Sequence, residues 1–200
     1  MEKDEYRTLQ DVSQGLYKEK GSKFIAIAIP VGSVEEVKLQ MEQLRKKYHD
    51  ARHHCYAYRL GDEPYEFRYN DDGEPSGTAG KPIFGQIQSF ELTNILIVVI
   101  RYFGGVKLGT GGLIQAYRTA ARDAIENGII ISKTWKISME IRFNYTQMND
   151  VMRVIKDAGL RIIRQDSKEK CCILLEINKG IFEAIEMKFS SFEMLECTVI

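Results

Sequence analysis

The stretch ILIVVIRYFGGVKLGTGGLIQAYRTAAR, residues 95–122, contains a strand, a glycine-rich loop and the start of a helix. Its first six residues are aliphatic, which is typical of a strand buried on both faces. From Gly112 onward, Leu113 and Tyr117 share one stripe with three alanines at helical spacing, while polar residues fall on the opposite side. The stretch therefore predicts a buried strand that leads directly into an amphipathic helix.

The loop between this strand and helix predicts an anion site. Glycine costs backbone entropy, so five glycines within residues 104–112 indicate positive φ angles or close backbone approach. Free amides at the start of the helix, with the helix dipole behind them, attract negative charge. The predicted anion-binding residues are Arg101, Gly104, Gly105, Lys107, Gly109, Thr110, Gly111, Gly112, Arg118 and Arg122. The alternative is that the glycines serve only to pack the helix on the sheet. The loop fits neither a Walker A motif nor G-x-G-x-x-G.

Composition gives few limits on function. The 200 residues contain 28 basic and 28 acidic side chains, so binding to a polyanion would need a local patch. No apolar run is long enough to cross a membrane, and the charged first residues are unlike a signal peptide. Four cysteines without C-x-x-C spacing predict reduced thiols, and we expect a cytoplasmic protein.

The first half of the chain predicts a mixed sheet-and-helix domain. Residues 6–16 favour a first strand or an ordered arm, and residues 22–30 and 53–60 favour strands. A capping box at Ser33 and Glu36 opens a helix, and a short helix is expected over residues 82–90. Between them, residues 61–81 are interpreted as one long loop.

That long loop is acidic, with six carboxylates against one arginine. Six carboxylates could hold Mg²⁺, but no EF-hand register fits, and a solvated loop is the preferred interpretation. The possible accessory site residues here and on the preceding strand are His54, Asp72, Glu74, Ser76, Thr78 and Lys81. Cys55, Ser76 and Thr78 raise the question of a nucleophile, but neither G-x-S-x-G nor H-E-x-x-H is present. We expect no catalytic residue, metal or cofactor.

The second half predicts the order β-α-β-β-α-β of a ferredoxin-like domain. Strands are expected at residues 135–143, 160–167, 171–178 and 193–200, and helices at 145–158 and 180–189. The two middle strands form a hairpin around residues 168–170. The sequence thus predicts an α+β protein with domains at residues 1–132 and 133–200.

Three segments resemble the YigZ/IMPACT family. These are His54-Cys-Tyr-Ala-Tyr58, the run from Asp71 to Gly80, and the block from Arg101 to Leu113. The resemblance covers nearly the whole chain. It implies a first domain akin to domain IV of elongation factor G, and a second akin to the ferredoxin-like domains of that factor. It also implies a link to translation, since the eukaryotic relatives regulate a translation-stress kinase pathway through a large partner protein. Those relatives have an additional N-terminal partner-binding domain, which we do not expect before Tyr6.

Three functions are therefore considered. The preferred one is a non-catalytic, translation-linked regulator that binds RNA or the ribosome through the basic glycine-rich loop, with a translation-associated protein as a further partner. The first alternative is a Mg²⁺-dependent phosphate or nucleotide site, with or without enzymatic activity. The second is a protein-interaction scaffold in which the glycine loop is only structural, so that Gly111→Val would unfold the domain. The sequence does not define the oligomeric state.

Overall fold

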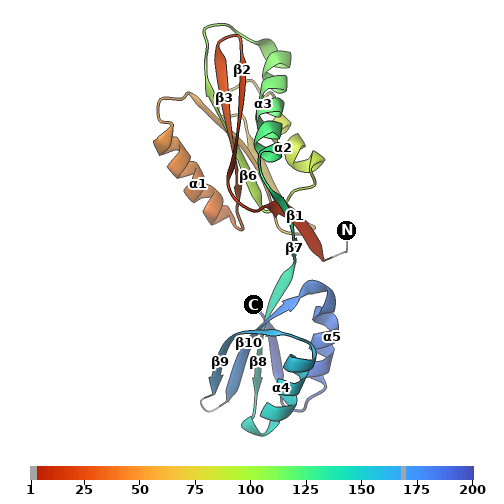
Figure 1. Cartoon of the computed structure of the whole chain (residues 1–200). Coiled ribbons are helices and arrows are strands. Elements are labelled where there is room, and N and C mark those ends of the chain that lie inside the picture. The colour runs from red at the N-terminus through yellow and green to blue at the C-terminus, as the bar shows by residue number, and fades with distance from the viewer. Residues whose placement is uncertain (1–3, 168–169) are drawn as a thin grey trace. The chain divides into compact units, whose positions relative to one another are not determined.

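The computed structural model describes residues 4–167 and 170–200, and its contacts divide the chain into two units. The first unit is Arg7–Ser132, and the second is Lys133–Ile200 together with residues 4–6. Each unit combines helices with an antiparallel sheet, which confirms the expected α+β class (Figure 1).

The first unit is built on a five-stranded sheet with the order β2-β3-β6-β4-β5. These strands are β2 (Ser13–Glu19), β3 (Ser22–Pro30), β4 (His53–Leu60), β5 (Glu66–Asn70) and β6 (Ile95–Tyr102). All four neighbouring pairs are antiparallel. The central strand β6 pairs with both β3 and β4, so that Phe24 and His53 flank Arg101 from either side.

Helices cover both faces of this sheet. Helices α2 (Gly80–Ser89) and α3 (Gly109–Glu126) pack on one face, and α1 (Val34–Lys47) packs on the other (Figure 1). Alternate residues of β6 serve the two cores: Ile97 and Val99 contribute to the α2–α3 side, and Val98 and Ile100 to the α1 side. The prediction that this strand is buried on both faces is confirmed.

The helix predictions are confirmed, with small shifts in their ends. The apolar stripe of α3 is buried as expected, but the helix begins at Gly109 instead of Gly112. The Ser33 hydroxyl caps α1 by accepting the Glu36 amide at 3.2 Å. The Glu36 carboxylate accepts from the Gly32 amide.

Two expectations for the first unit need correction. Residues 6–16 do not form one element, because they divide between β1 (Glu5–Leu9) and β2. The long acidic segment is not all loop, because it contains β5, an edge strand of the sheet. Strand β1 pairs with β7 (Ile130–Thr134) in a separate two-stranded sheet.

The second unit has the predicted β-α-β-β-α-β order. Its elements are β8 (Lys136–Phe143), η1 (Tyr145–Gln147), α4 (Met148–Asp157), β9 (Arg161–Ser167), β10 (Cys171–Asn178), α5 (Lys179–Ser190) and β11 (Glu196–Val199). The strands form an antiparallel sheet in the order β11-β8-β10-β9, as a split β-α-β topology requires. Two residues of the expected hairpin turn, 168 and 169, lie outside the described residues.

Across the described ranges, no helix has the length and apolar character needed to cross a bilayer.

Candidate nucleic-acid interface

The glycine-rich loop leaves the end of β6 and lies against the turn between β2 and β3. Gly104 makes this contact through its backbone: its amide donates to the Ser22 hydroxyl at 3.2 Å. A Cβ built at Gly104 would lie 1.9 Å from the carbonyl carbon of Gly21, so this position has no room for a side chain. The two loops together, residues 20–23 and 103–112, are called the tip below.

The other glycines of the tip differ in what they require. Gly105 and Gly109 have φ angles of +89° and +71°, which side chains rarely adopt. Gly111 has neither constraint, since a Cβ there would meet nothing within 4 Å. The expectation that Gly111→Val unfolds the domain is therefore wrong on steric grounds.

The tip presents positive charge and apolar surface. Lys20, Lys23 and Lys107 are exposed, and none has an ion-pair partner among the described residues. Phe103 and Val106 have exposed fractions of 53% and 52%. In the part of the chain that the structure describes, no side chain caps the amino end of α3, so the amides of its first turn remain available to a ligand.

Arg101 does not belong to this exposed surface. It is buried, and its guanidinium Nη1 lies 2.6 Å from Glu74 Oε1, with the two side chains only 7% and 4% exposed. The same carboxylate oxygen accepts the Tyr117 hydroxyl at 2.8 Å. The predicted role of Arg101 as a free cation is corrected accordingly: its charge is held inside the domain. Its guanidinium carbon also lies 5.6 Å from the centre of the Phe103 ring, a cation–π contact that links Arg101 to the tip.

The acidic segment is solvated only in part: Glu63 and Glu66 are exposed, whereas Asp71, Asp72 and Glu74 are engaged within the fold. The Asp71 carboxylate accepts the amides of Gly77, Ala79 and Gly80 at 2.8–2.9 Å, and so caps α2 from a distance along the chain. Asp72 binds the Arg45 guanidinium at 2.9 Å and the His54 amide at 2.6 Å. Within residues 4–167 and 170–200, no group of three His, Cys, Asp or Glu side chains is arranged to hold a metal ion.

The remaining accessory residues separate into buried and exposed groups. His54 and Thr78 are buried, and the Thr78 hydroxyl donates to the Pro75 carbonyl at 2.6 Å. Ser76 and Lys81 are exposed. The Cys55 thiol is fully buried, where it donates to the Asp71 carbonyl at 3.0 Å, and burial raises its pKa. A thiolate nucleophile at this position is therefore disfavoured.

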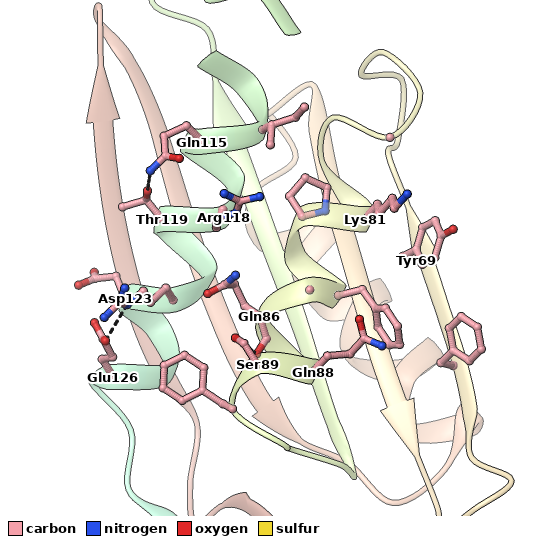
Figure 2. Close-up of a pocket in the computed structure, with 18 residues that line it drawn as sticks. Tyr69, Lys81, Gln86, Gln88, Ser89, Gln115, Arg118, Thr119, Asp123 and Glu126 are labelled. Atoms are coloured by element: carbon pink, nitrogen blue, oxygen red, sulfur yellow. Dashed lines mark hydrogen bonds and ion pairs between the residues drawn. The ribbon is translucent and has the colours of Figure 1, made fainter. Parts of the chain in front are cut away.

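Arg118 and Arg122 lie away from the tip, in a groove between α2 and α3. The groove has a volume of about 1400 Å³ and is also lined by Lys81. Figure 2 shows Arg118 on the side of α3 that faces α2 and Gln86 on the side of α2 that faces α3, while Lys81 lies on the other side of α2, beside Tyr69. Arg122 is engaged by Glu126 at 2.7 Å, whereas Arg118 has no ion-pair partner in the described parts of the chain. The predicted basic set is thus divided among the domain interior, the tip and the groove.

The aromatic rim of the groove was missed from the sequence. Phe67 and Tyr69 lie on β5 and line the groove with exposed fractions of 49% and 42%. The signal was present, since aromatic residues at every second position are typical of a strand with one apolar face. It was overlooked because the surrounding carboxylates suggested a loop.

Comparison with known proteins identifies the class. The model of the Impact N-terminal domain matches residues 20–125, which is more than half of the chain. The chain belongs to the IMPACT family.

Individual relatives agree with this assignment. IMPACT family member YigZ of Escherichia coli is 36% identical over 149 residues, covering 74% of this chain and 73% of the relative. A crystal structure described as a hypothetical protein matches 98% of both chains with 28% identity and a TM-score of 0.75. The two-domain translational regulator Yih1 matches 60% of this chain and 48% of its own, at 24% identity and a TM-score of 0.42, which is too low to equate the folds.

The first prediction concerns the two kinds of tip glycine. Gly104→Ala is expected to lower the free energy of unfolding by about 1–3 kcal/mol, because the added methyl group collides with the Gly21 backbone. Gly111→Ala is expected to raise it by about 0.5–1 kcal/mol, because alanine favours the helix and meets no neighbour. Urea denaturation followed by circular dichroism measures both. Equal effects of the two changes would contradict the assigned roles.

The second prediction concerns the buried ion pair. Glu74→Gln leaves the Arg101 charge buried without its counterion, and should lower the free energy of unfolding by about 3–5 kcal/mol. The matched control is Glu126→Gln, which removes the exposed partner of Arg122 and should cost about 0–1 kcal/mol. Chemical denaturation at one salt concentration compares them, and a Glu74→Gln protein as stable as its control would show that the buried pair is dispensable.

The third prediction is a loss of stability in acid. Burial lowers the pKa of His54, so the folded state favours the neutral ring, and stability should fall as the pH drops below about 6.5, the ordinary histidine value. Burial works to raise the pKa of Asp72, but hydrogen bonds from Arg45 and the His54 amide outweigh it and hold that pKa below its usual value. Its contribution should be lost at still lower pH, below about 4. Denaturation midpoints at pH 7.5 and 5.5 test the histidine step, which His54→Asn should remove.

Proposed function

We propose that this protein is a non-catalytic, translation-linked regulator whose first unit binds RNA, free or in the ribosome, through the tip. One observation carries the proposal: the tip combines three exposed lysines that have no ion-pair partner among the described residues with the uncapped amino end of α3 and an exposed phenylalanine. The resemblance to the IMPACT family adds the link to translation, and we place the protein in the cytoplasm on the same grounds.

The chemistry of the tip fits a phosphate backbone. Exposed lysines neutralise phosphates and release counterions, and first-turn amides donate to phosphate oxygens. An exposed ring such as Phe103 offers a face on which an unpaired base can stack. The tip has no carboxylate with which to hold Mg²⁺, since Asp71, Asp72 and Glu74 are engaged elsewhere. This favours binding of a polyanion over a metal-dependent nucleotide site.

The fourth prediction tests the tip directly. The triple variant Lys20→Ala/Lys23→Ala/Lys107→Ala should bind RNA at least tenfold more weakly near 0.1 M salt. The slope of log K against log salt should become shallower by about 2, since each contact to a single strand contributes about 0.7. Fluorescence anisotropy with a labelled RNA and co-sedimentation with ribosomes measure the two effects. A matched control removes three exposed lysines elsewhere, Lys38, Lys47 and Lys156.

A second variant separates binding from folding. Gly111→Glu places a carboxylate in the first turn of α3, where it meets no neighbour and suits the helix dipole. It should leave the thermal midpoint unchanged or higher while weakening RNA binding. If wild type binds neither RNA nor ribosomes, or if the tip triple binds as the control does, the proposed function is wrong.

A further inference from the structure

The surface of the groove between α2 and α3 differs from that of the tip. The geometry points to a binding site for single-stranded RNA in this groove, with bases on the aromatic rim of β5 and the phosphate backbone along the cations of α2 and α3 (Figure 2). This inference rests on the proposed function, that the first unit binds RNA, and adds the form of RNA it takes.

The aromatic rim provides stacking surface. The Phe67 ring lies nearly parallel to the Phe84 ring, with centroids 4.9 Å apart and an interplanar angle of 21°. Tyr69 stacks on Phe67 at 6.5 Å and 29°. Phe84 is buried and anchors the group, while Phe67 and Tyr69 remain about half exposed on the edge strand. Stacked rings at a sheet edge accept unpaired bases, whereas the bases of a duplex are already enclosed.

The unpaired charge in the groove is positive. Arg118 on α3 and Lys81 on α2 both line it, Lys81 beside Tyr69 (Figure 2), and neither has an ion-pair partner in residues 4–167 or 170–200. The acidic side chains at its far end are occupied: Glu126 pairs with Arg122, and Asp123 accepts the Leu16 amide at 2.8 Å. One of these cations lies beside the exposed rings and the other lies across α2 from them, which matches a ligand that carries both phosphates and bases.

At Gly85 the groove lacks a side chain, although nothing nearby would exclude one. Gly85 lies within α2 and lines the groove, and a Cβ built there would meet nothing within 4 Å. Glycine is unfavourable inside a helix, and no neighbour excludes a side chain at position 85, so neither helix stability nor packing explains this glycine. The volume of about 1400 Å³ exceeds the range of about 300–1,000 Å³ usual for small-molecule sites, and suits an extended ligand.

The groove is continuous with the tip along one face of α3. Gly111, Gln115 and Arg118 are all exposed, and their spacing of four and three residues places them on one stripe. Seven residues of helix separate Gly111 from Arg118, or about 10 Å. A strand of a few nucleotides bound at the tip can therefore continue into the groove.

The experiment compares a labelled, unstructured 12-nucleotide RNA with an RNA hairpin duplex by fluorescence anisotropy. Gly85→Glu places a negative charge in the open groove and should weaken binding of the single strand at least tenfold. Gly85→Gln, of nearly equal size, should change it no more than threefold, and Gly85→Lys should not weaken it. Phe67→Leu/Tyr69→Leu, which keeps apolar side chains but removes the ring faces, should weaken single-strand binding at least tenfold and duplex binding little. Thermal midpoints confirm that each variant folds.

The outcomes distinguish the two proposals. If Gly85→Glu and Phe67→Leu/Tyr69→Leu bind the 12-mer as wild type does, the groove assignment is overturned, and the tip lysine triple then decides the proposed function separately. The groove assignment is equally overturned if those variants keep their RNA affinity and lose a protein partner instead. If the wild-type protein binds no RNA of either form, the groove assignment is overturned, and the proposed function fails as well if ribosomes are not bound.

Discussion

The buried ion pair between Arg101 and Glu74 holds the first unit together near the tip. It joins the central strand β6 to the segment that precedes α2, and the Tyr117 hydroxyl adds α3 to the same carboxylate. Removing two charges from water is costly, so such a pair persists only with close geometry and further hydrogen bonds. A contact of 2.6 Å and a second donor at 2.8 Å meet that condition. The strand, the segment before α2 and the helix are therefore fixed relative to one another beneath the tip.

Three acidic residues that suggest a functional loop in the sequence instead hold the elements beneath the tip in place. Asp71 caps α2, Asp72 holds Arg45 and the His54 amide, and Glu74 neutralises Arg101. These acids are engaged within the fold, and the exposed lysines of the tip have no ion-pair partner among the described residues. The positive character of the tip thus results from where the negative charges are held, in a chain whose formal net charge is zero.

Local patterns in the sequence predicted most of the fold. The six aliphatic residues of β6, the stripe of α3 and the Ser33 cap of α1 each depend on neighbours in sequence, and each is confirmed. The reciprocal half of the expected capping box is not formed, because the Glu36 carboxylate accepts the Gly32 amide instead of the Ser33 amide. The site was harder to predict, because its decisive contacts join distant residues. Arg101 and Glu74 are 27 residues apart, and Tyr117 is 43 residues from Glu74. No spacing rule reveals that such a cation is buried, and the aromatic rim of β5 was hidden among carboxylates that the fold uses elsewhere.

Residues 4–6 belong by their contacts to the second unit, although more than a hundred residues of the first unit separate them from the rest of it. The Trp135 amide donates to the Asp4 carbonyl at 2.7 Å, and the Tyr6 and Trp135 rings stack with centroids 4.1 Å apart. During synthesis, residues 4–6 therefore leave the ribosome more than a hundred residues before the partners that they contact. Cleaving the polypeptide after Ser132 would leave residues 4–6 on the fragment that lacks Trp135. A separately expressed second unit would therefore need these residues supplied as a peptide or fused by a linker.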